Sequence, residues 1–303
     1  MLVSVIIPTY NRGRTIARAV DSVLAQSWKS VEIIVVDSYS TDGTAEVLAS
    51  YGDKIRVIRQ AKEGPPAARN AGIKAATGEI ISFLDSDDEW LPGKLERQVK
   101  LLQAGEASGV KCCVCNARME FANQTLTSFA SARLHPEHCE GVWLNPAEVL
   151  TTRFLFFNQV VAVRREVLEQ TGYFRPGIME DYDLALRLSL LGPWAFIADP
   201  LVVWHEQLED GLTRKTSELE RCERASEILN DVSTSPWLGP LLPKALLLRQ
   251  LRALKQNIYA LRLSARPNAL ARLFAGFLLL YLRVCGALNR RLPSTPRMVT
   301  RPL

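Results

Sequence analysis

The stretch GEIISFLDSDDEW, residues 78–90, decides the fold, because a run of apolar residues ends in it at a cluster of carboxylates. Residues 79–84 predict a strand of a buried sheet. Asp85, Asp87 and Asp88 follow that strand directly. Two unit charges about 4 Å apart repel by roughly 1 kcal/mol in water and by about 4 kcal/mol at an effective dielectric constant near 20. The cluster therefore needs a positive partner or a structural reason to exist.

A divalent cation is a positive partner that suits this cluster. Mg²⁺ and Mn²⁺ prefer hard oxygen ligands, and proteins usually hold such ions through one or two carboxylates together with the phosphates of a substrate. The alternative is that a carboxylate caps the helix expected over residues 92–103, since the amino end of a helix favours negative charge. Capping requires a single carboxylate, so the excess of acidic residues favours metal and phosphate binding.

The remainder of the first 90 residues alternates strand and helix patterns, which predicts an α/β fold with a mainly parallel sheet flanked by helices. Asp37 ends a second buried strand, as Asp85 ends the strand over residues 79–84. Open α/β sheets bind ligands beyond the carboxyl ends of their strands, so both aspartates are expected to face one crevice. The other expected strands cover residues 3–8, 31–36 and 54–59, and expected helices cover residues 41–50 and 65–76. A further helix from Ile16 is expected to bury Ile16, Val20, Val23 and Leu24.

The composition is that of a globular protein, with 303 residues of which 48% are hydrophobic and 23% charged. The six cysteines have neither the density of a disulfide framework nor the paired spacing of a zinc site, so reduced thiols are expected. The three cysteines in VKCCVCNA (110–117) are expected to pack in a strand. Met1 leads into an apolar segment without a basic leader or a small-residue cleavage site. This pattern predicts a cytoplasmic protein.

Charge divides the chain into two parts. Residues 241–303 contain twelve Lys or Arg and no Asp or Glu, whereas residues 1–240 hold 25 basic and 32 acidic residues, a net charge of −7. Within the basic part, large aliphatic residues recur with helical spacing while basic residues occupy the other sides, which predicts a basic amphipathic helix. The aliphatic positions are Leu247, Leu251, Leu254, Ile258 and Leu261.

The basic region is expected to touch a membrane surface without crossing it. A spanning helix needs about 20 apolar residues, whereas the uninterrupted apolar run covers residues 273–282 and is followed by Arg283. A basic, leucine-rich segment suits an anionic membrane interface. The alternative is that the leucines pack against the rest of the chain or a second subunit, with the arginines reaching outward. Nucleic acid is not an expected partner, since no aromatic-interleaved or finger-like module accompanies the charge.

Four motifs, in this order, resemble glycosyltransferase family 2, the inverting enzymes of the GT-A fold. They are SVIIPTYNR (4–12), EIIVVDSYSTDGT (32–44), ARNAGIKAATGEIISFLDSDDEW (68–90) and EDYDLALRL (180–188). The resemblance implies a Rossmann-like GT-A domain, expected over residues 1–240. The helical basic C-terminal region is expected over residues 241–303.

The resemblance also implies which residues bind the nucleotide-sugar. The matching positions are Thr9, Tyr10, Asp37, Arg69, Asp85 and Ser86. Arg69 also has a simpler interpretation as a solvated helix residue. Many relatives read DDGS where this chain reads Asp37-Ser38-Tyr39-Ser40, so the pocket for the base is expected to differ.

Three further residues receive catalytic or metal-binding roles from the resemblance. Asp87, which forms a DxD motif with Asp85, matches the ligand of the metal that bridges the two phosphates. His205 resembles a histidine that completes the metal site, although it could equally be a hydrogen-bonded structural residue. Asp181 matches the catalytic base, and its alternative is to favour the amino end of the helix that it begins. Asp183 is expected to form an ordinary ion pair with Arg187, and Trp90 is expected to fill space below the site.

Together these residues predict a metal-dependent, inverting glycosyltransferase that uses Mn²⁺ or Mg²⁺. The donor is expected to be a nucleoside-diphosphate sugar, with UDP as the expected nucleotide. The acceptor is expected to be a hydroxyl of a cell-surface glycan, either a polysaccharide or a lipid-linked oligosaccharide. With the basic tail, this places the protein in the cytoplasm, peripheral at the inner face of the cell membrane.

Two other functions stay open. A sugar nucleotidyltransferase also combines a nucleotide, a metal and an α/β sheet, but the glycine-rich loop that would grip a triphosphate is missing from PTYNRGRT (8–15). A catalytically silent, membrane-associated adaptor that retained the fold would bind no nucleotide and would be indifferent to changes at Asp87.

Overall fold

The computed structural model of the protein describes residues 1–155, 158–206, 216–235, 242–264 and 296–303. The chain forms two compact units. The first unit joins residues 1–146, 154–206 and 298–303, and the second joins residues 147–153 and 207–297. The division expected after residue 240 stays a prediction.

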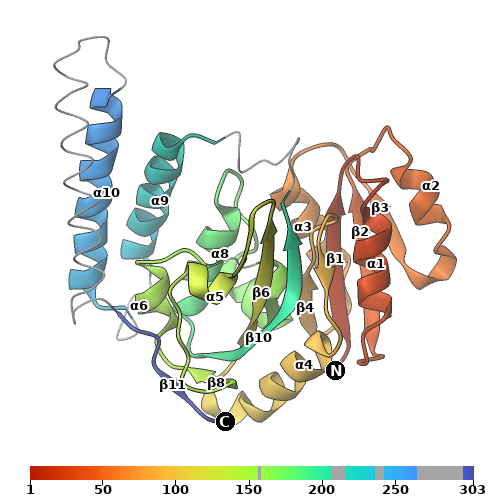
Figure 1. Ribbon diagram of the computed structural model, residues 1–303, viewed down its shortest axis with the longest axis horizontal. Helices are drawn as coiled ribbons and strands as arrows, with labels where there is room; N and C mark the ends of the chain where they lie inside the picture. The colour runs from red at the N-terminus through yellow and green to blue at the C-terminus, as the bar shows by residue number, and fades with distance from the viewer. Residues whose placement is uncertain (156–157, 207–215, 236–241, 265–295) are drawn as a thin grey trace. The chain divides into compact units, whose positions relative to one another are not determined.

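The strands of the first unit are, in chain order, β1 Val3–Thr9, β2 Val31–Asp37, β3 Arg56–Arg59, β4 Ile80–Phe83, β5 Glu89–Trp90, β6 Cys112–Phe121, β7 Gln124–Thr127, β8 Glu140–Trp143, β9 Val161–Arg164, β10 Trp194–His205 and β11 Thr300–Arg301. Among the described residues they form one sheet, with the path β11-β8-β10-β6-β9-β4-β1-β2-β3 (Figure 1). β5 pairs with β10 and β7 pairs with β6.

Parallel pairing dominates the half of the sheet that the sequence predicts. β1 runs parallel to β2 and β4, and β2 runs parallel to β3, which confirms the predicted parallel core. Thr9 lies opposite Asp37 in the register of β1 and β2, and Leu84 donates its N–H to the carbonyl of Ile6. The carboxyl ends of β1, β2 and β4 therefore meet at one edge of the sheet. β9 is inserted antiparallel to both β4 and β6, which the residue pattern did not predict.

The helices of the first unit are α1 Ile16–Leu24, α2 Thr44–Ala49, α3 Pro65–Ala75, α4 Lys94–Ala104, α5 Ser128–Ser131, α7 Arg165–Thr171 and α8 Glu180–Ser189, while α6 Pro146–Leu150 lies at the junction with the second unit. The predicted buried face of α1 is correct for Ile16, Val20 and Val23. It is wrong for Leu24, which ends the helix and is 37% exposed. A residue at the last position of a helix lies over the preceding turn, so it can leave the sheet even when the spacing fits.

The approach of α3 to the sheet depends on one glycine. A Cβ atom added to Gly72 would lie 2.4 Å from Cγ2 of Ile6 on β1. Only a residue without a side chain allows this distance, so Gly72 lets α3 pack directly on β1. The same buried face of the helix carries Arg69.

The interior of the first unit is densely packed. Trp143 and Trp194 meet edge to face, with their ring centroids 5.6 Å apart. Cys112, Cys113 and Cys115 are buried free thiols on β6, which confirms the prediction that this trio packs in a strand. Burial raises the pKa of each of these thiols, so they stay protonated and unreactive at neutral pH.

The second unit contains two long helices, α9 Glu218–Ser233 and α10 Lys244–Ser264, which pack on one another. α9 begins with a capping box in which Ser217 and Glu220 exchange hydrogen bonds. Arg262 of α10 donates to Glu223 of α9 at 2.5 Å. α10 confirms the predicted helix, and of its predicted apolar face Leu247 and Leu251 are buried while Leu254, Ile258 and Leu261 are half-buried. The apolar run at 273–282 and Arg283 lie outside the described residues. No helix in the described parts of the chain has the length and apolar character needed to cross a membrane.

Candidate functional site

The acidic cluster forms a tight turn between β4 and β5. The N–H of Asp88 donates to the carbonyl of Asp85 at 3.1 Å, which closes the turn. Ser86 and Asp88 are buried in it, while Asp85 and Asp87 are partly exposed. The alternative that the cluster caps the next helix is wrong, because α4 begins after Gly93 and receives no side-chain cap hydrogen bond. The carboxylates of this turn therefore form no cap hydrogen bond with α4.

Arg69 joins this turn to α8. Its Nη2 donates to Oδ1 of Asp85 and its Nη1 donates to Oε1 of Glu180, both at 2.7 Å. Arg69 is 3% exposed, so the interpretation of a solvated helix residue is wrong. Gln159 lies on the other side of the turn and donates to Asp85 and, at 2.9 Å, to Asp88. Three elements that are distant in sequence thus meet at one acidic turn.

Asp87 has the least occupied carboxylate of the three. Its Oδ2 lies 3.5 Å from Nε of Arg12, and Arg18 donates to its backbone carbonyl rather than to its side chain. Burial and the charge of Asp85 raise the pKa of Asp87, against the lowering effect of Arg12. Burial and the charges of Asp87 and Asp85 raise the pKa of Asp88 well above its usual range. Additional positive charge at this turn would stabilise the charged form of both carboxylates.

The donor set of the turn fits a divalent cation that is shared with a substrate. Asp85 and Asp88 already accept hydrogen bonds from protein groups, which leaves Asp87 as the available hard oxygen ligand. One carboxylate together with phosphate oxygens and waters is a usual environment for Mg²⁺. Among the residues that the structure describes, no three His, Cys, Asp or Glu side chains form a closed metal site. A cation at Asp87 would therefore depend on the phosphates of a bound ligand.

His205 lies near the turn but its ring points to other partners. Its backbone N–H donates to Oδ1 of Asp88 at 3.1 Å. Its ring nitrogens lie 3.3 Å from Glu89 and 3.3 Å from Glu120. The structure brings His205 to the acidic turn through its backbone, and the metal-binding role of its ring stays a prediction.

Two buried oxygen atoms at the carboxyl ends of β1 and β2 have no hydrogen-bond partner. Asp37 is fully buried, and its Oδ1 accepts from both the N–H and the hydroxyl of Ser40 at 3.0 and 2.5 Å. Its Oδ2 makes no hydrogen bond and lies 3.6 Å from Nε of Arg59. The hydroxyl of Thr9, beside Asp37 in the sheet, is also buried without a partner. Since such atoms are costly to leave unpaired, they suit a ligand that supplies hydrogen bonds.

The loops after β1 and β2 hold each other next to these two oxygen atoms. Asn11 adopts a left-handed backbone with φ of 51° and accepts a hydrogen bond from the N–H of Thr41 at 2.8 Å. Tyr10 carries the ammonium of Lys62 over its ring, 3.5 Å from the centroid. Tyr39 stands where many relatives of the resembled family have glycine, and it keeps a left-handed φ of 55° with 58% of its surface exposed. The departure at 37–40 therefore adds an exposed aromatic ring while preserving the turn.

Asp181 is the second residue of α8, directly after the Glu180 that Arg69 holds. Its Oδ1 accepts a hydrogen bond from the N–H of Tyr182 at 2.8 Å. Burial, followed by the charge of Glu180, raises the pKa of Asp181 to about 7, while Arg69 opposes the rise. A carboxyl group with this pKa can exchange protons near neutral pH, as a general base must.

Two structural roles expected from the sequence are confirmed. Asp183 pairs with Arg187 at 2.7 Å, and both side chains are buried. Trp90 fills space below the turn and donates its indole N–H to the carbonyl of Gln159 at 3.1 Å. Lys94 is fully buried 3.8 Å from the centroid of the Trp90 ring, and burial lowers its pKa to about 8.

Sequence reasoning missed Gln159 and the part that Glu180 plays. Gln159 belongs to a short 3-10 turn at 158–160 that precedes β9, and no motif or periodicity marks it. Its position depends on β9 entering the sheet beside β4, which is a long-range pairing. Glu180 stands in the same motif as Asp181. The sequence therefore showed Glu180 as an acidic residue beside the expected base, but it did not show its contact with Arg69.

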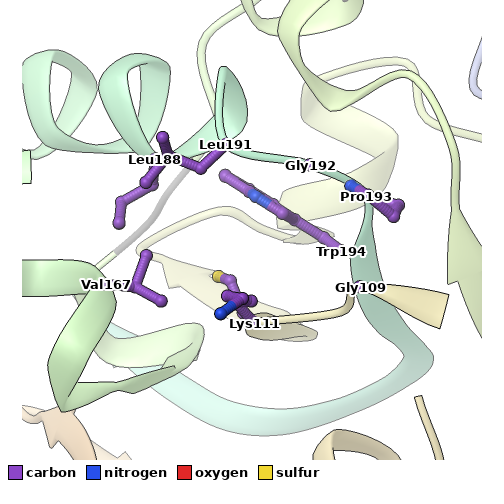
Figure 2. A pocket seen from close by; sticks show the side chains of 9 residues that line it. Gly109, Lys111, Val167, Leu188, Leu191, Gly192, Pro193 and Trp194 are labelled. Carbon is purple, nitrogen blue, oxygen red and sulfur yellow. The ribbon is translucent and has the colours of Figure 1, made fainter. Parts of the chain in front are cut away.

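A small apolar hollow lies away from these residues. It lies between the end of α8, the start of β10 and the start of β6, where Figure 2 shows Leu188, Leu191 and Trp194 facing Val167 and Lys111. α8 begins at Asp181's turn and ends at this hollow, so about 15 Å of helix separates the two. The hollow offers no carboxylate and is not part of the candidate site.

Comparisons with known proteins give one family. The sequence model of the family described as glycosyl transferase family 2 matches residues 4–172. The amylovoran biosynthesis glycosyltransferase AmsB of Erwinia amylovora is 31% identical over 211 residues, which are 67% of this chain and 69% of AmsB. An uncharacterized glycosyltransferase of Nostoc sp. is 46% identical over 114 residues, 36% of this chain and 35% of the relative. The matches to the first three curated relatives span only 26% to 35% of their lengths.

Solved structures show the same fold. S. aureus TarS 1–349, in complex with UDP-GlcNAc, superposes with a TM-score of 0.67 at 19% identity, over 86% of this chain and 73% of that one. Mannosyltransferase PcManGT from Pyrobaculum calidifontis, in complex with GDP-Man and Mn²⁺, superposes with a TM-score of 0.59 at 21% identity, over 96% and 81%. At these identities the likeness shows the fold alone, which is the GT-A fold predicted from the sequence.

Proposed function

The chain belongs to glycosyl transferase family 2, and from this membership we propose that it is an inverting enzyme that transfers a sugar from a nucleoside diphosphate to an acceptor hydroxyl. The observation that carries the proposal is the pair of hydrogen bonds from Arg69 to Asp85 and to Glu180. They bring the acidic turn after β4 and the first turn of α8, which contains Asp181, to one guanidinium group. A group for binding a donor and a group for activating an acceptor thereby lie at one site.

Asp181 is the proposed general base. It would accept the proton of the acceptor hydroxyl while that oxygen bonds to the anomeric carbon from the face opposite the diphosphate. The bond between this carbon and the diphosphate oxygen breaks in the same step, which inverts the configuration. A positioned base contributes about 10²- to 10⁴-fold to the rate, and a pKa of about 7 suits that role.

The nucleotide is proposed to bind at the carboxyl ends of β1 and β2. Thr9 and Asp37 each present a buried oxygen without a hydrogen bond there, and Tyr10 lies in the loop that follows β1. Because Ser40 occupies one carboxylate oxygen of Asp37, one oxygen remains without a hydrogen bond, beside Arg59, and it suits one ring N–H of a pyrimidine such as uracil. TarS is known in complex with UDP-GlcNAc and PcManGT in complex with GDP-Man. For this chain we propose UDP.

The diphosphate is proposed to lie beside Asp87. Mn²⁺ or Mg²⁺ bound at Asp87 would supply the positive charge that stabilises a departing diphosphate. Arg12 and Arg18 add two side-chain charges next to Asp87, and these can contact the same phosphates. The binding of Mn²⁺ in the PcManGT complex supports a divalent ion in a protein of this fold.

The acceptor is proposed to be a hydroxyl of a growing cell-surface glycan, either a polysaccharide or a lipid-linked oligosaccharide. AmsB, whose name places it in amylovoran biosynthesis, supports the polysaccharide class. Exposed basic residues on α10 support contact with an anionic membrane surface through residues 241–303. We therefore propose a cytoplasmic protein that is peripheral at the inner face of the cell membrane.

Titration calorimetry tests the nucleotide and the metal together. UDP, dTDP, GDP and UTP are each titrated into the full chain with and without Mn²⁺. We expect UDP to bind at least about tenfold more tightly with Mn²⁺, because the cation joins the diphosphate to Asp87. Preference for UTP would favour a nucleotidyltransferase. Binding of none of them would contradict the enzyme and support a silent adaptor.

A further inference from the structure

Arg69 is held in place from several sides. α3 packs directly on β1 because Gly72 has no side chain that would collide with Ile6. Asn70, the next residue, exchanges two hydrogen bonds with the backbone of Phe174 at 2.8 and 3.0 Å. The ring of Phe174 lies 5.4 Å from the guanidinium carbon of Arg69. The guanidinium group is therefore fixed before any ligand binds.

The two terminal nitrogens of Arg69 are used on carboxylates from two different elements. Asp85 follows β4, whereas Glu180 begins α8 and lies 111 positions from Arg69. Charge-assisted hydrogen bonds of 2.7 Å are among the stronger polar contacts in proteins. A nucleotide would have to compete with Asp85 and Glu180 for these nitrogens, so direct contact with the nucleotide is not the role that this geometry favours.

The start of α8 depends on an outside partner. Met179 precedes the helix with a left-handed φ of 58° and gives it no side-chain cap. Its first turn then carries Glu180, Asp181 and Asp183, and Asp183 is engaged by Arg187. Arg69 is the cation that meets Glu180 at the start of this turn. Removing Arg69 would remove the ion pair that joins Glu180 to α3 and, through Asp85, to the acidic turn.

We propose, on the basis of the function proposed above, that Arg69 is a positioning residue that fixes the first turn of α8 against the acidic turn after β4. In this role it holds Asp181 facing the donor and does not itself bind the nucleotide. Arg69 thus couples the two halves of the site. The sequence resemblance, by contrast, implied that Arg69 contacts the nucleotide.

Charges around Asp181 give this role a measurable signature. Glu180 on the same helix and Asp85 from the turn after β4 both raise the pKa of Asp181, and Arg69 from α3 lowers it. Without Arg69 only the two repulsive carboxylates remain, so Asp181 keeps its proton to a higher pH. If Arg69 only bound the nucleotide, its removal would lower the affinity for UDP and would leave the titration of Asp181 unchanged.

The experiment follows the carboxyl carbon of Asp181 by ¹³C NMR titration of the full chain, assigned by its absence in Asp181→Asn. Arg69→Met is expected to move the midpoint about one pH unit higher and to change UDP–Mn²⁺ affinity by less than about threefold, which is under 1 kcal/mol. Arg69→Lys keeps the charge but cannot span both carboxylates, so it is expected to move the midpoint less. Arg97→Met is the matched control, since Arg97 also joins two carboxylates, Glu140 at 2.9 Å and Asp199 at 2.8 Å, away from the site.

Two results would overturn the proposal. One is an unchanged midpoint in Arg69→Met, and the other is a loss of UDP affinity of about tenfold or more, equal to 1.4 kcal/mol. If Arg69→Met does not fold, Arg69→Gln, which also removes the charge, decides by the same two criteria. A wild-type chain that binds no nucleotide would contradict the proposed function alone, because the titration of Asp181 is measured without ligand.

Discussion

The raised pKa of Asp181 lowers the stability of the folded protein at neutral pH and also makes this residue suitable as a base. Its pKa in the folded protein is about 7, whereas the ordinary value of an aspartate is about 4. Between these two values the folded state holds the proton more tightly than the unfolded chain does, so stability falls as the pH rises from about 4 to about 7. Above pH 7 the full cost of the buried charge is present. The same shift makes the carboxylate a base at neutral pH.

Replacing Asp181 with asparagine is expected to separate these two effects. Asp181→Asn should lower the release of UDP from a UDP-sugar by about 10²- to 10⁴-fold, with water as the acceptor. It should leave UDP binding unchanged and raise the free energy of unfolding at pH 8 by about 1 kcal/mol or more. Wild-type activity should rise with pH to a plateau above about 7.

Enzyme assays and denaturant unfolding at several pH values check this prediction. Glu46→Gln is the control, because Glu46 is an exposed acidic residue in the first turn of α2. It should change neither activity nor the pH dependence of stability. Full turnover by Asp181→Asn would exclude Asp181 as the base.

Residue patterns identified the carboxylates at the strand ends but not their partners. The acidic turn after β4 and the buried aspartate that ends β2 follow from strand ends, which local sequence reveals. Gln159 could not be found in this way, because its contact with Asp85 requires β9 to enter the sheet antiparallel. The contact between Arg69 and Glu180 likewise depends on packing between α3 and α8.

At the scale of elements, the sequence predicts the first part of the sheet well. The strands and helices up to α4 all occur, since each has a clear local pattern, and their ends differ by up to three residues. Residues 52–54 form a 3-10 turn, which shortens the expected strand at 54–59 to β3. The later strands β6, β9 and β10 pair across long distances in the chain, so their order could not be derived from local patterns.

The close contact of α3 with β1 gives a prediction for the element that carries Arg69. Gly72→Ala should lower the free energy of unfolding by about 1–3 kcal/mol, because the new Cβ would lie 2.4 Å from Cγ2 of Ile6 and must displace it. Denaturant unfolding measures the change. Gly43→Ala is a matched control, since a Cβ there meets no atom within 4 Å. Helix propensity favours alanine over glycine, so propensity cannot account for a loss in Gly72→Ala. An equal loss in both variants would contradict crowding against Ile6 as the cause.

At the scale of the whole chain, charge and structure divide the molecule differently. The basic composition begins near residue 241, whereas the second compact unit also includes residues 147–153 and 207–240. α10 buries Leu247 and Leu251 while it packs on α9, which supports a packing role for part of its apolar face. Arg249, Arg252 and Lys255 remain exposed and available to a membrane surface.

Charge reversal on α10 tests the membrane contact. The triple variant Arg249→Glu, Arg252→Glu and Lys255→Glu should lose most binding to vesicles of phosphatidylserine and phosphatidylcholine, at about 1 kcal/mol for each basic residue removed. Co-sedimentation with vesicles measures this binding. The control reverses the exposed Lys29, Lys54 and Lys74 of the first unit, which gives the same net charge. Equal binding of both variants to the vesicles would contradict the membrane contact and leave packing as the role of α10.

β11 brings residues 300–301 back to the outer edge of β8, where the sheet would otherwise end. The carbonyl oxygen of Arg301 lies so close to Gly141 that a Cβ there would stand 2.3 Å from it. An uncovered edge strand offers its backbone groups to other chains, which invites aggregation and fibril growth. A shortened chain that ends before residue 298 is therefore expected to precipitate more readily than one that lacks only residues 265–295 and keeps β11.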